Sequence, residues 1–194
     1  MAYTGFRKAG FAVRTASAGV VSYGELQELK QGVKAEIKVS KVDGKLMAFD
    51  TIAEQEKYIS GATVTFECGY LTLEQESMLL GHTLSEDNKN ITVSMNDVAP
   101  DVAFYSVAKK KCNGVVSYTA IVLLKGIFGD SDITMQTAEE GSVTFGTTSI
   151  EGTFSADEDA SDVVLKKGEF DSVEDAMAFV KTTLGKTEGT EIQG

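Results

Sequence analysis

The sequence has very few of the side chains from which catalytic and metal sites are built. Its single histidine is His82, and its two cysteines, Cys68 and Cys112, lie far apart without CxxC or Cys/His spacing. A lone histidine is an incomplete metal site and a poor catalyst. Walker-type loops and the Gly-x-Ser-x-Gly and His-Glu-x-x-His motifs are also missing. We therefore expect no enzyme, no metal and no cofactor, and interpret His82 as a structural or surface residue.

Long apolar runs and prolines are scarce as well. No stretch of roughly eighteen apolar residues occurs, so we expect no membrane span. The first residues lack the apolar run and cleavage site of a signal peptide, so we expect no export by the general secretory route. Pro100 is the only proline, which leaves most strands free to be central in a sheet.

Positive charge is in short supply. The chain has 18 Lys and Arg against 29 Asp and Glu, a formal net charge of −11. Stable binding to nucleic acid needs clustered Lys and Arg, so we do not expect it. Nucleic acid that passes close by without binding is compatible with this composition. The alternative interpretation is that the surplus acid serves only solubility.

Segments in which polar and apolar residues alternate are the clearest pattern present. Residues 33–39, 62–68 and 116–120 each have this period of two, which is typical of a β-strand with one buried and one wet face. With 194 residues, 42% of them hydrophobic, the chain suffices for one sizeable core, so we predict a single domain over residues 1–194. The predicted strands are 11–15, 33–40, 45–50, 61–68, 91–95, 102–109, 115–125 and 142–155.

Two dipeptides predict hairpin turns. Asp43-Gly44 lies between two predicted strands, and Asn113-Gly114 joins strand 102–109 to strand 115–125. Residues of these types tolerate positive φ, as tight hairpin turns require. We expect residues 1–9 to form an arm outside the core, and residues 186–194 to be flexible.

Two helices are predicted from their caps. Thr72 and Gln75 form a capping-box pattern, and this helix should end at Gly81. The second helix should begin after Ser172 and end at Gly185. Its apolar stripe indicates packing against a sheet. The stripe consists of Val173, Met177, Val180 and Leu184.

Cysteines and acidic residues suggest no further chemistry. Cys68 lies on the apolar phase of its strand and is predicted to be a buried free thiol, whereas Cys112 should be exposed and reduced; the sequence leaves a disulfide between them open. Residues 157–162 resemble the start of a calcium loop. Asp162 and Gly168, however, stand where that loop needs Gly and Glu, so we interpret the segment as a solvated acidic loop.

The polar faces of the predicted strands are the candidate functional surface. They contain no aromatic side chains, so a base-stacking platform is not expected. Short uncharged or acidic side chains would make a smooth wall that binds polyanions poorly. The alternative is an ordinary solvent face of a β-sandwich. The candidates are Lys34, Glu36, Lys38, Thr63, Thr65, Glu67, Ser117, Thr119, Glu151 and Thr153.

Six segments occur in a characteristic order and spacing. They are Gly61-Ala-Thr-Val-Thr-Phe66, Leu79-Leu80-Gly81, Asp97-Val-Ala-Pro100-Asp-Val-Ala-Phe104, Lys109-Lys-Lys-Cys-Asn-Gly114, Leu124-Lys125-Gly126-Ile-Phe128 and Ile150-Glu151-Gly152-Thr153-Phe154. This series resembles the major tail tube proteins of phages with long, non-contractile tails, and the resemblance covers about residues 30 to 155. The chain departs from the family in having no Trp, and in having Asp101 after Pro100 where an aromatic is more usual.

The resemblance implies a mainly β fold. It would be an antiparallel β-sandwich or half-barrel with one or two short flanking α-helices, whose strands complete a shared inner barrel in a hexameric ring. Stacked rings would form a tube in the virion, assembled in the host cytoplasm, with residues 1–9, 40–60 and 128–141 as candidate joints between rings. Implied partners are other copies of the chain, the tape-measure, tail-tip and tail-terminator proteins, and genomic DNA in transit without specific binding.

The candidate residues would then line the lumen, with Glu36, Glu67 and Glu151 as its acidic members. Lys34 and Lys38 leave two possibilities: they pair with neighbouring carboxylates, or their strand turns its other face inward. The rival interpretation of the whole chain is a monomeric β-sandwich binding or adhesion module, which would need exposed aromatics in a groove.

Overall fold

Antiparallel strands make up most of the protein. The computed structural model describes residues 2–17, 20–48, 51–129, 132–133, 146–157 and 161–185. The strands are β1 (Ala2–Ser17), β2 (Val20–Tyr23), β3 (Gln27–Glu28), β4 (Gly32–Ala48), β5 (Thr51–Cys68), β6 (Thr83–Leu84), β7 (Ile91–Thr92), β8 (Val102–Cys112), β9 (Val115–Phe128), β10 (Asp132–Ile133), β11 (Thr148–Ser155) and β12 (Leu165–Phe170), and the helices are α1 (Leu73–Leu80) and α2 (Val173–Thr183).

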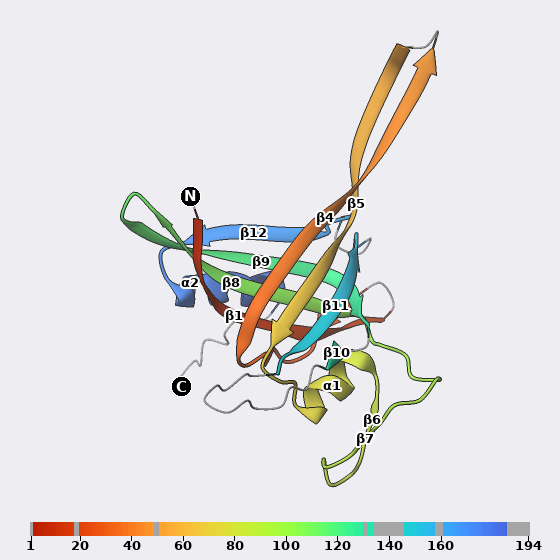
Figure 1. Ribbon diagram of the computed structural model, residues 1–194, viewed down its shortest axis with the longest axis vertical. Helices are drawn as coiled ribbons and strands as arrows, with labels where there is room; N and C mark the ends of the chain where they lie inside the picture. The colour runs from red at the N-terminus through yellow and green to blue at the C-terminus, as the bar shows by residue number, and fades with distance from the viewer. Residues whose placement is uncertain are drawn as a thin grey trace, which may run out of the picture.

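The main sheet has the order β2-β1-β8-β9-β11-β5-β4 and forks at β9. Residues 118–123 of β9 pair with β12, whereas residues 125–128 pair with β11. Because of this fork, the β11-β5-β4 part folds over the β1-β8-β9 part, and β4 and β5 cross in front of β8 and β9 (Figure 1). The expectation of a mainly β, antiparallel fold is confirmed, and a half-barrel describes it.

An aromatic cluster fills the space between the two parts of the sheet. Phe104 on β8 lies at its centre, with its ring centroid 6.0 Å from that of Phe66 on β5 and 5.9 Å from that of Phe128 on β9. Phe154 on β11 completes the cluster, and all four side chains are fully buried. Edge-on ring pairs of this kind stabilise a core beyond the burial of their area.

The two helices cover different parts of the sheet. Leu79 and Leu80 of α1 join the aromatic core, while Ala176 and Val180 of α2 pack with Val122 in a second cluster on the opposite face of β9. Both predicted N-caps are confirmed: the Thr72 and Ser172 side chains accept backbone hydrogen bonds, and Thr72 forms the reciprocal capping box. The predicted left-handed glycines, Gly81 and Gly185, end the helices with φ of 76° and 68°.

The predicted turn at Asp43-Gly44 is wrong. Asp43 pairs with Lys57 and Gly44 with Glu56, and the ladder continues to Ala48 and Thr51. The two predicted strands on either side of Asp43-Gly44 are therefore one strand, β4. The outer half of the β4–β5 hairpin stands away from the body of the protein (Figure 1).

Residues 2–9, expected to form an arm, are the first half of β1. They pair with β8 from Ala2 opposite Lys111 onward, and the pairing runs to Val13 opposite Val102. Ala9 is buried in the core. Local composition predicts an arm here because the partner strand, β8, is about a hundred residues away in the sequence.

Other predicted elements are shorter than expected or lie outside the described residues. The strand at 91–95 is reduced to β7, and the predicted Asn113-Gly114 turn is confirmed with φ of 49° and 85°. The strand expected at 142–155 begins at Thr148 as β11, and residues 142–145 are outside the described part. Most of the candidate joint 128–141 and the whole segment 186–194 also lie outside it.

Candidate functional site

Eight of the ten candidate residues form one continuous polar face. On β4 and β5, Lys34 lies opposite Glu67, Glu36 opposite Thr65 and Lys38 opposite Thr63. On the other side of β5, β11 places Glu151 opposite Thr65 and Thr153 opposite Thr63. Since side chains alternate along each strand, these residues share the outer surface of three adjacent strands, which we call the polar face.

The opposite surface of the same three strands is the core. Val64 and Phe66 of β5, with Ile150 and Phe154 of β11, are almost fully buried. A slip of one residue in the register would exchange the two surfaces, so burial of these apolar side chains fixes which residues form the polar face.

Glu36 is bridged by the two lysines of its own strand. Its carboxylate oxygens lie 2.9 Å from Lys34 Nζ and 3.0 Å from Lys38 Nζ. Hydrogen bonds from Lys34 and Lys38 lower the pKa of Glu36 to about 2. Both lysines share the face of Thr63 and Thr65, so of the two possibilities raised by the sequence the structure has the first, pairing with a neighbouring carboxylate.

The polar face has little net charge. Its eight candidate residues comprise two lysines and three glutamates, giving a net charge of −1. Glu67 also accepts a hydrogen bond of 2.8 Å from Thr147 Oγ1. A polyanion that approaches such a surface finds no cluster of free cations, so few counterions would be released on contact.

Ser117 and Thr119 do not belong to the polar face. Ser117 is half-buried and donates a 2.7 Å hydrogen bond to Glu169 on β12, and Thr119 is only 2% exposed. The expectation of a wet face is therefore wrong for Thr119, whereas Ser117 is half-buried to the same degree as Thr63 and Thr65.

An irregularity in β9 separates the first half of this strand from the polar face. The pairing of β8 with β9 shifts between Val102 opposite Gly126 and Phe104 opposite Leu123, which leaves one extra residue on β9. Leu123 and Phe128 consequently point into the same core although they are an odd number of residues apart. Beyond the shift, Ile127 lies opposite Thr153 and is 49% exposed, so it is an apolar neighbour of the polar face. Simple alternation counted from residue 117 does not predict this position, because the extra residue changes the phase of the strand.

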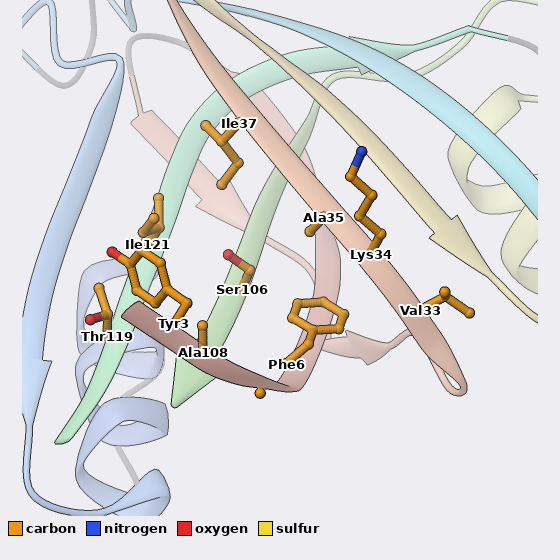
Figure 2. A pocket seen from close by; sticks show the side chains of 11 residues that line it. Tyr3, Phe6, Val33, Lys34, Ala35, Ile37, Ser106, Ala108, Thr119 and Ile121 are labelled. Carbon is orange, nitrogen blue, oxygen red and sulfur yellow. The ribbon is translucent and has the colours of Figure 1, made fainter. Parts of the chain in front are cut away.

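An open groove lies where the inner side of β4 passes over β1, β8 and β9. It has a volume of about 450 Å³. Ala35 and Ile37 of β4 form one wall, and Phe6, Ser106 and Ile121 lie across from them (Figure 2). Within the described residues, no strand pairs with the outer edge of β4, so this side of the half-barrel is open. The remaining lining residues are Tyr3, Gly5, Val33, Lys34, Ala108 and Thr119.

The projecting hairpin carries apolar side chains in solvent. Tyr58 and Ile59 on β5 are 59% and 57% exposed, and Val39 and Val42 on β4 are 38% and 39% exposed. Exposed apolar residues that gather on one element mark an interaction surface more often than singly scattered ones do.

The predicted solvated acidic loop contains a buried ion pair. Asp157 is fully buried, and its carboxylate accepts hydrogen bonds from Arg14 Nη2 at 2.6 Å and Nε at 3.1 Å. The Tyr23 hydroxyl lies 3.5 Å from the same carboxylate, and burial raises the pKa of Tyr23 to about 12. In the described ranges, no group of three or more His, Cys, Asp or Glu side chains is placed to hold a metal ion.

The histidine and the two cysteines noted in the sequence have structural surroundings that account for them. His82 is buried, and its Nδ1 lies 2.9 Å from Asp97 Oδ2, a pairing that sequence spacing does not reveal. Cys68 is a buried free thiol, as predicted, and burial raises its pKa to about 11. Cys112 is also free but is half-buried rather than exposed.

No protein-family model matches the chain, and a comparison with curated proteins finds no match. Among the described residues, no helix is long and apolar enough to cross a membrane.

Proposed function

We propose that the protein is a structural subunit of a phage tail tube, which polymerises as stacked hexameric rings around a channel for genome delivery. The observation that carries the proposal is the polar face: β4, β5 and β11 join eight small or charged side chains into one surface with a net charge of −1. Such a surface suits a wall along which DNA slides, because it offers DNA no cluster of free cations.

The open edge of β4 supports assembly. Within the described chain the outer side of β4 has no neighbouring strand, and an exposed edge of this length invites pairing with another chain. Closing a barrel between identical copies satisfies the edge and continues the polar face around a channel. The tape-measure, tail-tip and tail-terminator proteins and DNA in transit are the partners that this role implies, and the virion is the location.

The projecting hairpin supports stacking. Its outer half stands away from the body of the protein (Figure 1), and the hairpin exposes Tyr58, Ile59 and Val42 beyond Gly61. In the proposed tube this hairpin bridges one ring to the next, burying the apolar side chains that are exposed in a single subunit.

One observation favours the alternative, a monomeric β-sandwich binding or adhesion module. Tyr3 and Phe6 place two aromatic rings in the open groove, and such a module needs aromatics in a groove. The groove volume of about 450 Å³ would admit a small apolar ligand. This function requires no self-association, which separates it from the tube.

Electron microscopy of the purified chain over a range of concentrations tests the proposal. We expect rings or tubes whose channel is wide enough for a DNA duplex. A matched variant in which a short turn replaces residues 41–59 should still form rings but should not form tubes. A chain that stays monomeric at high concentration, also when tail-tip proteins are added, would contradict the proposal and favour the binding module.

A further inference from the structure

A second exposed apolar surface lies on the loop between β7 and β8. Val93, Met95 and Val98 are 60%, 103% and 81% exposed, the greatest concentration of apolar exposure in the described chain outside the hairpin. We call residues 93–98 the apolar loop. Its three apolar side chains face solvent, although the fully buried Val102 follows only four residues after Val98.

The apolar loop is held in a defined conformation. Asp97 Oδ2 accepts a 2.9 Å hydrogen bond from the Ser94 backbone N–H and lies 2.9 Å from His82 Nδ1. The Asp97 N–H in turn donates to the Ser94 carbonyl at 3.1 Å. At the end of the loop, the Val98 carbonyl packs so closely on Gly81 that a Cβ there would collide with it. A loop already ordered in this way loses little entropy on binding.

The groove under β4 has matching chemistry. Tyr3 and Val33 expose 57% and 58% of their surface at the groove, and Phe6, Ile37 and Ile121 lie deeper. Its volume of about 450 Å³ lies in the range of roughly 300–1,000 Å³ that is typical of binding pockets, enough for more than one side chain. Methionine is unbranched and flexible, so it fits irregular apolar grooves well.

The charges beside the two surfaces have opposite signs. The β8–β9 hairpin, whose strand β8 contributes Ala108 to the groove, carries Lys109, Lys110 and Lys111 in succession. Residues 83–98 carry Glu86, Asp87 and Asp97 against Lys89 alone. Among the described residues, neither Lys111 nor Glu86 forms an ion pair.

The lysine-bearing hairpin and the acidic segment also lie on different sides of the subunit. In Figure 1 the β8–β9 hairpin is at the upper left, whereas the β6–β7 segment is at the lower right. Complementary surfaces that are separated in this way do not meet within one chain. They generate a head-to-tail contact between copies, which closes into a ring when the rotation permits.

We propose that the apolar loop of one copy docks into the groove of the next copy, with Met95 inserted beside Tyr3 and Phe6 and with Glu86 facing Lys111. The occupant of the groove is thus a second copy of this chain. The inference rests on the proposed function, since it adds a second contact between neighbouring copies to the one at the β4 edge, and it can fail while rings still form.

Cross-linking between two proteins that each carry one accessible cysteine, besides the buried Cys68, tests the contact. Both are the full chain with Cys112→Ser; one carries Met95→Cys and the other carries Tyr3→Cys. After mixing and treatment with a short bis-maleimide, we expect a covalent dimer that contains one copy of each. The matched control replaces Tyr3→Cys with Val20→Cys, which is 68% exposed on β2, at the other end of β1 from Tyr3. The control mixture should give at least tenfold less product.

Charge reversal provides the second measurement. Glu86→Lys in the Met95→Cys protein should reduce the cross-linked product several-fold, and Lys111→Glu in the Tyr3→Cys protein should restore it. Rings seen by electron microscopy without cross-linked product above the control would overturn this inference and leave the ring proposal standing. A chain that remains monomeric would overturn both. Product that does not respond to either charge reversal would overturn the assigned pairing of Glu86 with Lys111.

Discussion

Arg14 and Asp157 form a buried ion pair through two hydrogen bonds, Nη2 to Oδ1 at 2.6 Å and Nε to Oδ2 at 3.1 Å. The two residues are 143 positions apart, so the pair ties β1 to the segment after β11. The arginine also lies 3.6 Å from Asp101, just before β8. One interior charge therefore connects three separate parts of the chain.

Removing one member of this ion pair should destabilise the folded protein. Asp157→Asn leaves the arginine buried without its full counter-charge, so we expect the free energy of unfolding to fall by about 3–5 kcal/mol. Urea denaturation followed by circular dichroism measures it. Asp162→Asn, on the exposed part of the same segment, is the control and should change stability by no more than about 0.5 kcal/mol. Equal effects of the two substitutions would contradict the prediction.

The bridged carboxylate on β4 should titrate at unusually low pH. Lys34 and Lys38 hold the pKa of Glu36 at about 2 against an ordinary value of 4.5, so ionisation of this group favours the folded state. Its contribution is fully present above about pH 4.5 and is lost as the pH falls toward 2.

Nuclear magnetic resonance of the Glu36 carboxyl carbon measures this pKa. We expect the double variant Lys34→Met, Lys38→Met to raise it toward 4.5. The control variant Lys41→Met, Lys57→Met removes the same charge from the projecting hairpin and should leave the pKa of Glu36 nearly unchanged. The prediction is wrong if both variants shift it equally.

Two left-handed glycines should respond differently to alanine. Gly81→Ala introduces a Cβ against the Val98 carbonyl, whereas Gly114→Ala meets nothing within 4 Å. Gly114→Ala should cost about 1 kcal/mol from backbone strain alone, and Gly81→Ala clearly more. Thermal and urea unfolding of the two variants give the comparison. If Gly81→Ala proves no worse than Gly114→Ala, the packing of the apolar loop on α1 is not as described.

The two thiols should differ in reactivity. Cys68 is fully buried and its pKa is raised to about 11, so at pH 8 it has little thiolate and little access to reagent. Cys112, half-buried at the end of β8, should react first with a thiol reagent in the native protein. We expect the absorbance of the reagent to show that one thiol per chain reacts rapidly, and that this reaction is lost in the Cys112→Ser variant. The second thiol should react only in denaturant. Fast modification of Cys68 in the folded chain would show that its strand opens readily.

Local signals were sufficient where the neighbouring residues alone decide the conformation. The caps at Thr72 and Ser172 and the turn at Asn113-Gly114 were predicted because a side chain or a positive φ only a few residues away determines them. Asp43-Gly44 has the same turn chemistry, yet cross-strand pairing with Lys57 and Glu56 keeps it extended. The free energy contributed by turn propensity is small compared with that of a continuous ladder of hydrogen bonds between the strands.

Contacts between distant segments account for what the sequence could not predict. Alternation placed the residues of β4, β5 and β11 correctly on one face, but it failed at Thr119 because β9 is covered on both faces, by the aromatic core on one side and by α2 on the other. Asp157 was assigned to solvent because its partner, Arg14, is far away in sequence. Likewise, nothing near His82 indicated Asp97, fifteen residues on.

The projecting hairpin also has a mechanical consequence. About eight residues of each strand extend beyond Gly61, so at 3.3 Å per residue the tip reaches roughly 26 Å from its base. The base contains a register shift between Ser40 and Lys41, and Gly61 sits against the Phe154 backbone with no room for a side chain. A two-stranded ribbon on such a base amplifies small rotations: a rotation of about 10° there would move the tip by roughly 4–5 Å.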